Sequence, residues 1–312
     1  PIWPKPLRPS VRLLRHKQNS PLRALISRSI YSILLRVRLP LPLFSAKSSA
    51  TISLEKMNNQ KFLLEICVDS LPSALAAVQG GADRLELCSN LLLGGTTPDF
   101  YLFEQVRQSC PIPIHVLIRP RAGHFYYSDA EFEQIQDQVR RFRSAGADGL
   151  VIGLLTSERR LDLPRLLSLT SQSFGCHLTL HRAFDWVADP QAALEQAISL
   201  GFDTILTSGH QATAFEGLDL LCMLIHQAAG RIDIMAGGGV NEQNIPQIHL
   251  QAGIRNYHLS GKIRLPSPLS DHQSLIQFGR DSSEDLELWQ TSVEKVRDCR
   301  RVLDKLLENF DA

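Results

Sequence analysis

Short apolar runs alternate with longer helical patterns along the chain from about residue 61. The runs are rich in Val, Ile and Leu, which is typical of strands buried on both faces of a parallel sheet. They cover residues 62–67, 84–88, 114–118, 149–153, 177–181, 204–206, 232–235 and 256–259. Helical patterns cover residues 70–79, 99–109, 129–144, 162–171, 190–199, 218–229 and 242–251, and a last helix is predicted at 284–307.

A glycine separates a helical pattern from the next run at four junctions, which are Gly81, Gly146, Gly201 and Gly253. Glycine is the usual residue where a helix closes in a left-handed conformation. Asp129 and Asp189 are the expected N-caps of the helices beside them. Eight strand–helix repeats in about 250 residues predict an α/β fold, a single (β/α)8 TIM-type barrel with an extra C-terminal helix. Residues 262–283 are expected to form a long irregular connection.

Residues 1–60 differ from the rest of the chain, with eleven Lys or Arg, one acidic residue and no Gly. We expect them to form a disordered N-terminal extension outside a barrel domain of residues 61–312. The composition fits an organellar transit peptide. It fits a segment upstream of the native protein equally well, because the first methionine is Met57. We therefore expect the protein in the cytoplasm, or in an organelle if the extension is a transit peptide.

The composition of residues 61–312 excludes several classes of partner. They hold 22 basic and 31 acidic residues, a net charge of −9, which argues against nucleic acid because phosphate binding needs a basic face. No apolar run reaches the roughly 18 residues of a membrane span. The six cysteines contain no Cys-x-x-Cys pair, which indicates free thiols in a reducing compartment.

Ionisable side chains occur at strand positions that a barrel would otherwise fill with Val, Ile or Leu. Alternate residues of a strand share one face, so these groups point into the barrel if that face is the inner one. Buried charges are costly unless paired. The set is therefore an acid–base site with separated pKa values, or a satisfied internal ion-pair network. The candidate catalytic residues are Glu65, Glu86, Arg119 and His181.

Further polar and glycine residues follow the later strands, where barrels bind their ligands. A triple glycine after the seventh strand can present backbone N–H groups to a phosphate, or it can simply be a turn that needs positive φ. Arginine side chains suit carboxylate or phosphate ligands. The candidate ligand-binding residues are Arg121, Arg182, Asp185, Ser208, Gly237, Gly238, Gly239 and His258.

Two cysteines, Cys67 and Cys88, end neighbouring strands of the predicted barrel. Neighbouring strands lie about 4.8 Å apart, so two thiolates could share one soft cation such as Cu(I). A buried free cysteine is also often only a small apolar side chain.

Several motifs in sequence order resemble the CutC copper homeostasis family. They are residues 65–70 (EICVDS), 80–88 (GGADRLELC), 94–98 (GGTTP), 118–121 (IRPR), 181–185 (HRAFD), 206–209 (LTSG) and 237–239 (GGG). The resemblance covers about residues 61–262 and implies a TIM-type barrel, a homo-oligomer and a Cu(I) site. Cys67 and Cys88 match the cysteines suspected of holding copper in animal relatives. The chain departs from the family at Leu117, commonly Met, at residues 122–124, commonly Gly-Asp, and at Ala236, commonly Pro.

Two functions remain open on these grounds. The first is a copper homeostasis protein that binds Cu(I) through Cys67 and Cys88. The alternative is a TIM-barrel enzyme that acts on a small anionic metabolite, phosphorylated or carboxylated, by acid–base chemistry. The polar barrel interior motivates the second hypothesis, because copper storage alone does not require it.

Overall fold

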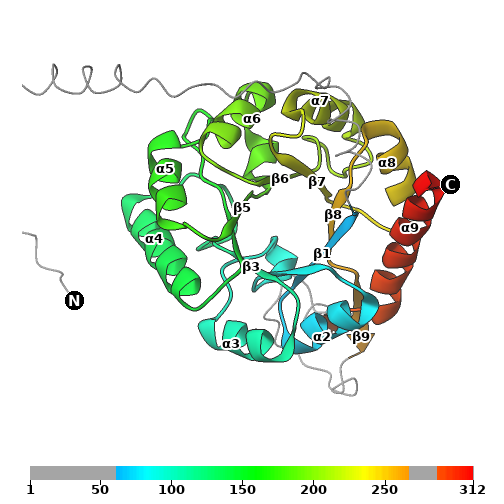
Figure 1. Ribbon diagram of the computed structural model, residues 1–312. Helices are drawn as coiled ribbons and strands as arrows, with labels where there is room; N and C mark the ends of the chain where they lie inside the picture. Colours follow the sequence, from blue (N-terminus) through cyan, green and yellow to red (C-terminus); the bar gives the residue numbers. More distant parts are fainter. Residues whose placement is uncertain (1–60, 267–286, 312) are drawn as a thin grey trace, which may run out of the picture. The chain divides into compact units, whose positions relative to one another are not determined.

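The computed structural model describes residues 61–266 and 287–311; the expectations for residues 1–60 and 267–286 lie outside this range. Eight parallel strands close in chain order into one barrel (Figure 1). They are β1 (Leu63–Val68), β2 (Arg84–Leu87), β3 (Ile114–Leu117), β4 (Gly149–Ile152), β5 (His177–Leu180), β6 (Thr204–Thr207), β7 (Asp233–Gly237) and β8 (Asn256–Leu259). The predicted TIM-type barrel is confirmed.

Helices form a ring around these strands (Figure 1). They are α2 (Leu71–Gly80), α3 (Phe100–Ser109), α4 (Asp129–Ser144), α5 (Leu163–Gln172), α6 (Pro190–Ser199), α7 (Leu218–Ala228), α8 (Ile245–Ala252) and α9 (Val293–Asp311). The expected C-terminal helix is present as α9, which packs between α2 and α8 and completes the ring. Among the described residues, no helix is both long enough and apolar enough to cross a bilayer.

The chain between β8 and α9 differs from the expectation. Residues predicted as the first turns of the last helix form β10 (Glu287–Thr291), which pairs antiparallel with β9 (Lys262–Pro266). The Trp289 ring lies under two cations of β9, about 5 Å from its centroid, and such contacts stabilise the extended pairing. The helix begins only at Val293, after the hydroxyl of Ser292 accepts a hydrogen bond from the Lys295 amide.

Helix N-caps follow the expected chemistry with one correction. Asp189 caps α6 by accepting the amide hydrogen of Ala192. The cap of α4 is Ser128 rather than Asp129, because Ser128 and Glu131 form a reciprocal capping box. Asp129 is therefore the first residue of α4.

The main apolar core lies between the barrel strands and the helices. Outward-facing strand residues are fully buried there, among them Leu64, Ile66, Leu85, Leu87, Ile114 and Leu150. All four junction glycines have positive φ, between 68° and 95°. A Cβ at Gly146, Gly201 or Gly253 would meet no atom within 4 Å, so the left-handed backbone, not lack of space, favours glycine there. Because the helices bury the outward faces, the inward faces are left for polar chemistry.

Candidate functional site

A cavity of about 540 Å³ opens at the carboxyl ends of the barrel strands. Several residues expected from the sequence line it, and they are Cys67, Glu86, Arg119, His181, Arg182 and His258. They come from β1, β2 and β8 or from the segments just after β3 and β5, which is the end where barrels of this type place their sites. The volume lies within the range typical of small-molecule sites.

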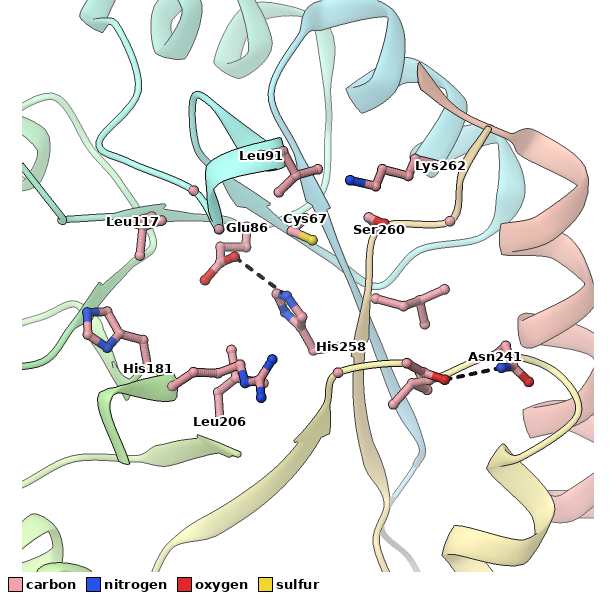
Figure 2. Close-up of a pocket in the computed structure, with 18 of the residues that line it drawn as sticks. Cys67, Glu86, Leu91, Leu117, His181, Leu206, Asn241, His258, Ser260 and Lys262 are labelled. Carbon is pink, nitrogen blue, oxygen red and sulfur yellow. Dashed lines mark hydrogen bonds and ion pairs between the residues drawn. The ribbon is translucent and has the colours of Figure 1, made fainter. Parts of the chain in front are cut away.

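Three potential metal ligands lie together on one side of the cavity (Figure 2). Cys67, Glu86 and His258 are buried, and their ligand atoms lie within 4.8 Å of one another. Backbone register explains the grouping: Cys67 is the Cα partner of Glu86 on β2, and β8 flanks β1 on its other side. The Nε2 atom of His258 lies 3.6 Å from a carboxyl oxygen of Glu86.

Glu65 lies beneath this cluster and does not line the cavity. It is completely buried and binds Arg84 through Nε at 2.6 Å and His258 through Nδ1 at 2.7 Å. Burial alone would raise the pKa of Glu65, but Arg84 and His258 together hold it well below its usual value. Glu65 is thus an ionised carboxylate that pairs with Arg84 and His258. This arrangement matches the internal ion-pair network that the sequence left open as an alternative to an acid–base site.

The pKa values of Glu86 and His258 are raised, whereas that of Glu65 is lowered. Burial raises the pKa of Glu86 to about 7, and the nearby negative charge of Glu65 adds to this against the opposing effect of His258. Burial would lower the pKa of His258, but Cys67, Glu86 and the hydrogen bond to Glu65 raise it well above its ordinary value. Without a bound cation, a proton therefore sits on His258 between two carboxyl groups.

The chemistry of the cluster fits a soft or borderline metal ion. A thiol and an imidazole are the ligands that Cu(I) and Zn²⁺ prefer, and both must lose a proton on binding. The bond from His258 Nδ1–H to Glu65 is the arrangement that orients a metal-binding imidazole, because it leaves Nε2 for the metal.

Cys88 lies outside this three-residue cluster. Its side chain is fully buried in a small apolar cluster with Leu117 and Val151. The thiol donates to the carbonyl of Val68 at 3.5 Å. Burial raises the pKa of Cys88 well above its ordinary value. Cys88 is therefore a protonated thiol beside the site.

Arg119 and His181 also line the cavity. The Arg119 guanidinium donates to the carbonyls of Leu93, Gly94, Gly95 and Gly123, so it fixes the loops after β2 and β3.

His181 is buried, and its Nδ1 accepts the amide hydrogen of Ala183 at 3.1 Å. The ring proton must then lie on Nε2, which meets no acceptor among the described residues. Burial and the Arg119 charge lower the pKa of His181 to about 3. Around neutral pH the cavity wall therefore includes a neutral imidazole with its proton on Nε2.

Arg182 donates hydrogen bonds to Asp185 and Ser208, which were also expected to bind the ligand. Its Nε donates to Asp185 at 2.7 Å, and a terminal nitrogen donates to the hydroxyl of Ser208 at 2.7 Å. Asp185 also accepts the amide hydrogen of Ser208. Asp185 and Ser208 do not line the cavity, so they position Arg182.

Of the remaining residues expected to bind a ligand, some line the cavity and others lie outside it. Gly238 and Gly239 line the cavity, whereas Gly237 ends β7 outside its wall. Arg121 also lies outside, where it binds Glu131 and the carbonyls of His124 and Tyr126.

Several residues of the site were not foreseen from the sequence. Arg84 faces into the barrel beside Glu65, and strand alternation with Glu86 could have found it. Lys262, Lys295 and Cys299 line the cavity from β9 and α9. Lys262 closely follows the eighth strand, whereas no local pattern marks Lys295 and Cys299, because only the packing of α9 between α2 and α8 brings these two there.

Comparisons with known proteins agree with this architecture. A family model described as the CutC family matches residues 62–263. The chain is 43% identical over 247 residues to the copper homeostasis protein cutC homolog of Homo sapiens, covering 79% of this chain and 90% of that protein. It is 40% identical over 242 residues to the family protein CutC of Pasteurella multocida, covering 78% and 99%.

A solved structure is similar as well. The crystal structure of CutC from Streptococcus agalactiae aligns with a TM-score of 0.61 and 32% identity, covering 64% of this chain and 98% of that one. The protein described here belongs to the CutC family.

Proposed function

We propose that this protein serves copper homeostasis by binding Cu(I) at Cys67 and His258, with Glu86 beside them. The observation that carries the proposal is the buried cluster in which the ligand atoms of these three residues lie within 4.8 Å of one another. The relative from Homo sapiens, whose name includes copper homeostasis, supports copper as the ion.

The ligand chemistry favours Cu(I) over a hard cation. Thiolate sulfur and imidazole nitrogen bind Cu(I), whereas Mg²⁺ and Ca²⁺ take oxygen ligands and need several of them. Binding would release the protons of the Cys67 thiol and of His258 Nε2. Glu65 would keep the imidazole oriented, since it accepts the Nδ1 proton. Cys88 remains the alternative second thiolate that the sequence suggested.

A Cu(I) competition titration tests this proposal and separates the two ligand pairs. Reduced protein competes with a chromophoric Cu(I) chelator in the absence of oxygen, and Cys67→Ser, His258→Gln and Cys88→Ser are compared. We expect the first two to lose most of the affinity and Cys88→Ser to keep it. Equal losses of Cu(I) affinity in Cys67→Ser and Cys88→Ser would indicate that Cys88, and not His258, is the second ligand. Unchanged affinity in Cys67→Ser would overturn the proposal.

Two finer expectations belong to this proposal. We place the protein in the cytoplasm, where its free cysteines would stay reduced, with an organelle as the alternative. The family resemblance also implies a homo-oligomer. Light scattering of the purified chain tests the second expectation, and a monomer over the micromolar range would contradict it.

A second candidate function is acid–base catalysis on a small organic molecule. The cavity favours it, because one ion fills only a small part of 540 Å³. Glu86 and the Nε2–H group of His181 line that cavity, and both types of group commonly transfer or donate protons in enzymes. Proton exchange of dihydroxyacetone phosphate in D₂O, followed by NMR, tests this. Exchange that Glu86→Gln removes would support catalysis; no exchange above the buffer rate would count against this reaction class.

A further inference from the structure

We propose that the loop after β7 and Arg182 form a binding site for the phosphate group of a small organic phosphate monoester. The site lies in the same cavity as the Cys67 cluster but uses different residues. It requires neither copper nor catalysis.

The loop after β7 offers backbone donors that have no partner. Gly238, Gly239 and Val240 line the cavity, and within the described part of the chain no acceptor takes a hydrogen bond from their backbone N–H groups. Gly239 is exposed and Gly238 half-exposed, so these N–H groups are open to water or to a ligand. Gly238 and Gly239 have φ of 98° and 68°, and such glycine-rich turns form concave anion sites.

Arg182 brings a fixed guanidinium to this loop. A Cβ placed on Gly238 would lie only 3.2 Å from a terminal nitrogen of Arg182, so the guanidinium lies directly against the glycine. Asp185 and Ser208 hold the Nε atom and the other terminal nitrogen. The nitrogen beside Gly238 is thereby aimed by the network rather than by a ligand, which lowers the entropy cost of binding an anion.

The charge around the cavity favours an anion with more than one negative charge. Arg119, Arg182, Lys262 and Lys295 line it, against the carboxyl groups of Glu86 and Glu242. Figure 2 shows Lys262 extending toward Leu91 on the side of the cavity where Cys67 lies. Lys295 of α9 donates from Nζ to the carbonyl of Lys262 at 3.2 Å, so its ammonium group lies beside β9.

These features together select phosphate over a carboxylate. Three neighbouring N–H groups and the free terminal nitrogen of Arg182 match an anion with three terminal oxygens, whereas a carboxylate has only two. The rest of the cavity is lined partly by apolar side chains, Leu117, Phe125 and Leu206. An organic group attached to the phosphate would fill this part, which is why we infer a phosphate monoester and not free phosphate.

Calorimetric titration of the full chain with glycerol 3-phosphate, inorganic phosphate and lactate tests the proposal. We expect glycerol 3-phosphate to bind more tightly than inorganic phosphate, and lactate to bind weakest. Arg182→Gln should weaken glycerol 3-phosphate binding about tenfold or more, because a charge-assisted hydrogen bond is lost. Lys262→Gln should weaken it less. Arg264→Gln is the matched control, since Arg264 lies on the same strand but outside the cavity wall.

The outcomes separate this site from the copper site. Cys67→Ser should bind glycerol 3-phosphate as the unmodified protein does, and Lys262→Gln should keep its Cu(I) affinity. No saturable binding of either phosphate at millimolar concentration would overturn the proposal. Lactate binding as tightly as glycerol 3-phosphate would overturn the choice of phosphate. If Arg182→Gln does not fold, Arg182→Lys decides, because lysine keeps the positive charge but not the fixed guanidinium; an unchanged affinity for glycerol 3-phosphate in that variant would reject the role of Arg182.

Discussion

Glu65 accepts a 2.7 Å hydrogen bond from Nδ1 of His258, and the two residues are direct Cα partners on β1 and β8. This bond joins the interior ion-pair network to the cluster that faces the cavity. The second carboxyl oxygen of Glu65 binds Arg84. One fully buried carboxylate therefore neutralises the arginine of β2 and orients the imidazole of β8.

Replacing Glu65 should destabilise the protein strongly. Glu65→Gln leaves the buried Arg84 without its counter-charge, and breaking a buried pair in this way costs about 3–5 kcal/mol. The Glu195→Gln variant is the control, because Glu195 forms an exposed ion pair with Arg231 and such pairs contribute about 1 kcal/mol or less. Urea unfolding measures both variants. A Glu65→Gln loss no larger than that of Glu195→Gln would show that the network adds nothing to stability.

The Glu86 carboxyl should make the stability of the metal-free protein fall with pH. Its folded pKa of about 7 lies above the ordinary value of 4.5. The folded state therefore favours the protonated form, and this stabilisation is fully present below about pH 4.5 and is lost as the pH rises towards 7. Glu86→Gln should remove this loss, on the order of 3 kcal/mol.

Unfolding free energies measured in the presence of a chelator at intervals from pH 4.5 to 8 would show the effect. Glu104→Gln, on the exposed face of α3, should follow the unmodified protein. A Glu86→Gln profile with the same slope as the unmodified protein would contradict the raised pKa of Glu86.

The barrel could be predicted from the sequence because its signals are local. Each strand is an apolar run, and glycines with positive φ mark the junctions at Gly81, Gly146, Gly201 and Gly253. The strand β10 was missed because Glu287–Thr291 carries no strong strand pattern of its own. Its pairing with β9 and the stacking of Lys262 and Arg264 on Trp289 come from residues more than twenty positions away.

The candidate site was predicted where strand alternation decides the outcome. Inward positions placed Cys67, Glu86 and His181 at the cavity, as the structure finds. The role of each residue in the site was harder to predict, because the residue type does not show which side chain it will contact. Glu65 and Glu86 have similar sequence contexts, yet Arg84 beside Glu65 lowers the pKa of one while burial raises that of the other.

The cysteines should differ in reactivity, and copper should change only one of them. Cys88 is fully buried with a raised pKa, so iodoacetamide should leave it unmodified at pH 7.5. Cys222 is half-buried and should react fastest, with or without copper. Cys67 should react slowly and become protected when Cu(I) binds. Mass spectrometry of the peptides reads each site. Protection of Cys222 instead of Cys67 would place copper elsewhere.

His181 should stay neutral, with its proton on Nε2, far below the pH at which an ordinary histidine is charged. The amide of Ala183 donates to Nδ1, and burial and Arg119 lower the pKa of His181 to about 3. The stability that follows from this depressed pKa is present above about pH 6.5 and is lost as the pH falls towards 3. Nitrogen-15 NMR of the imidazole should therefore show one Nε2–H tautomer from pH 7 down to about pH 4. A His181 ring that titrates near pH 6.5 would mean that solvent reaches it, and the neutral imidazole inferred from its burial would then be wrong.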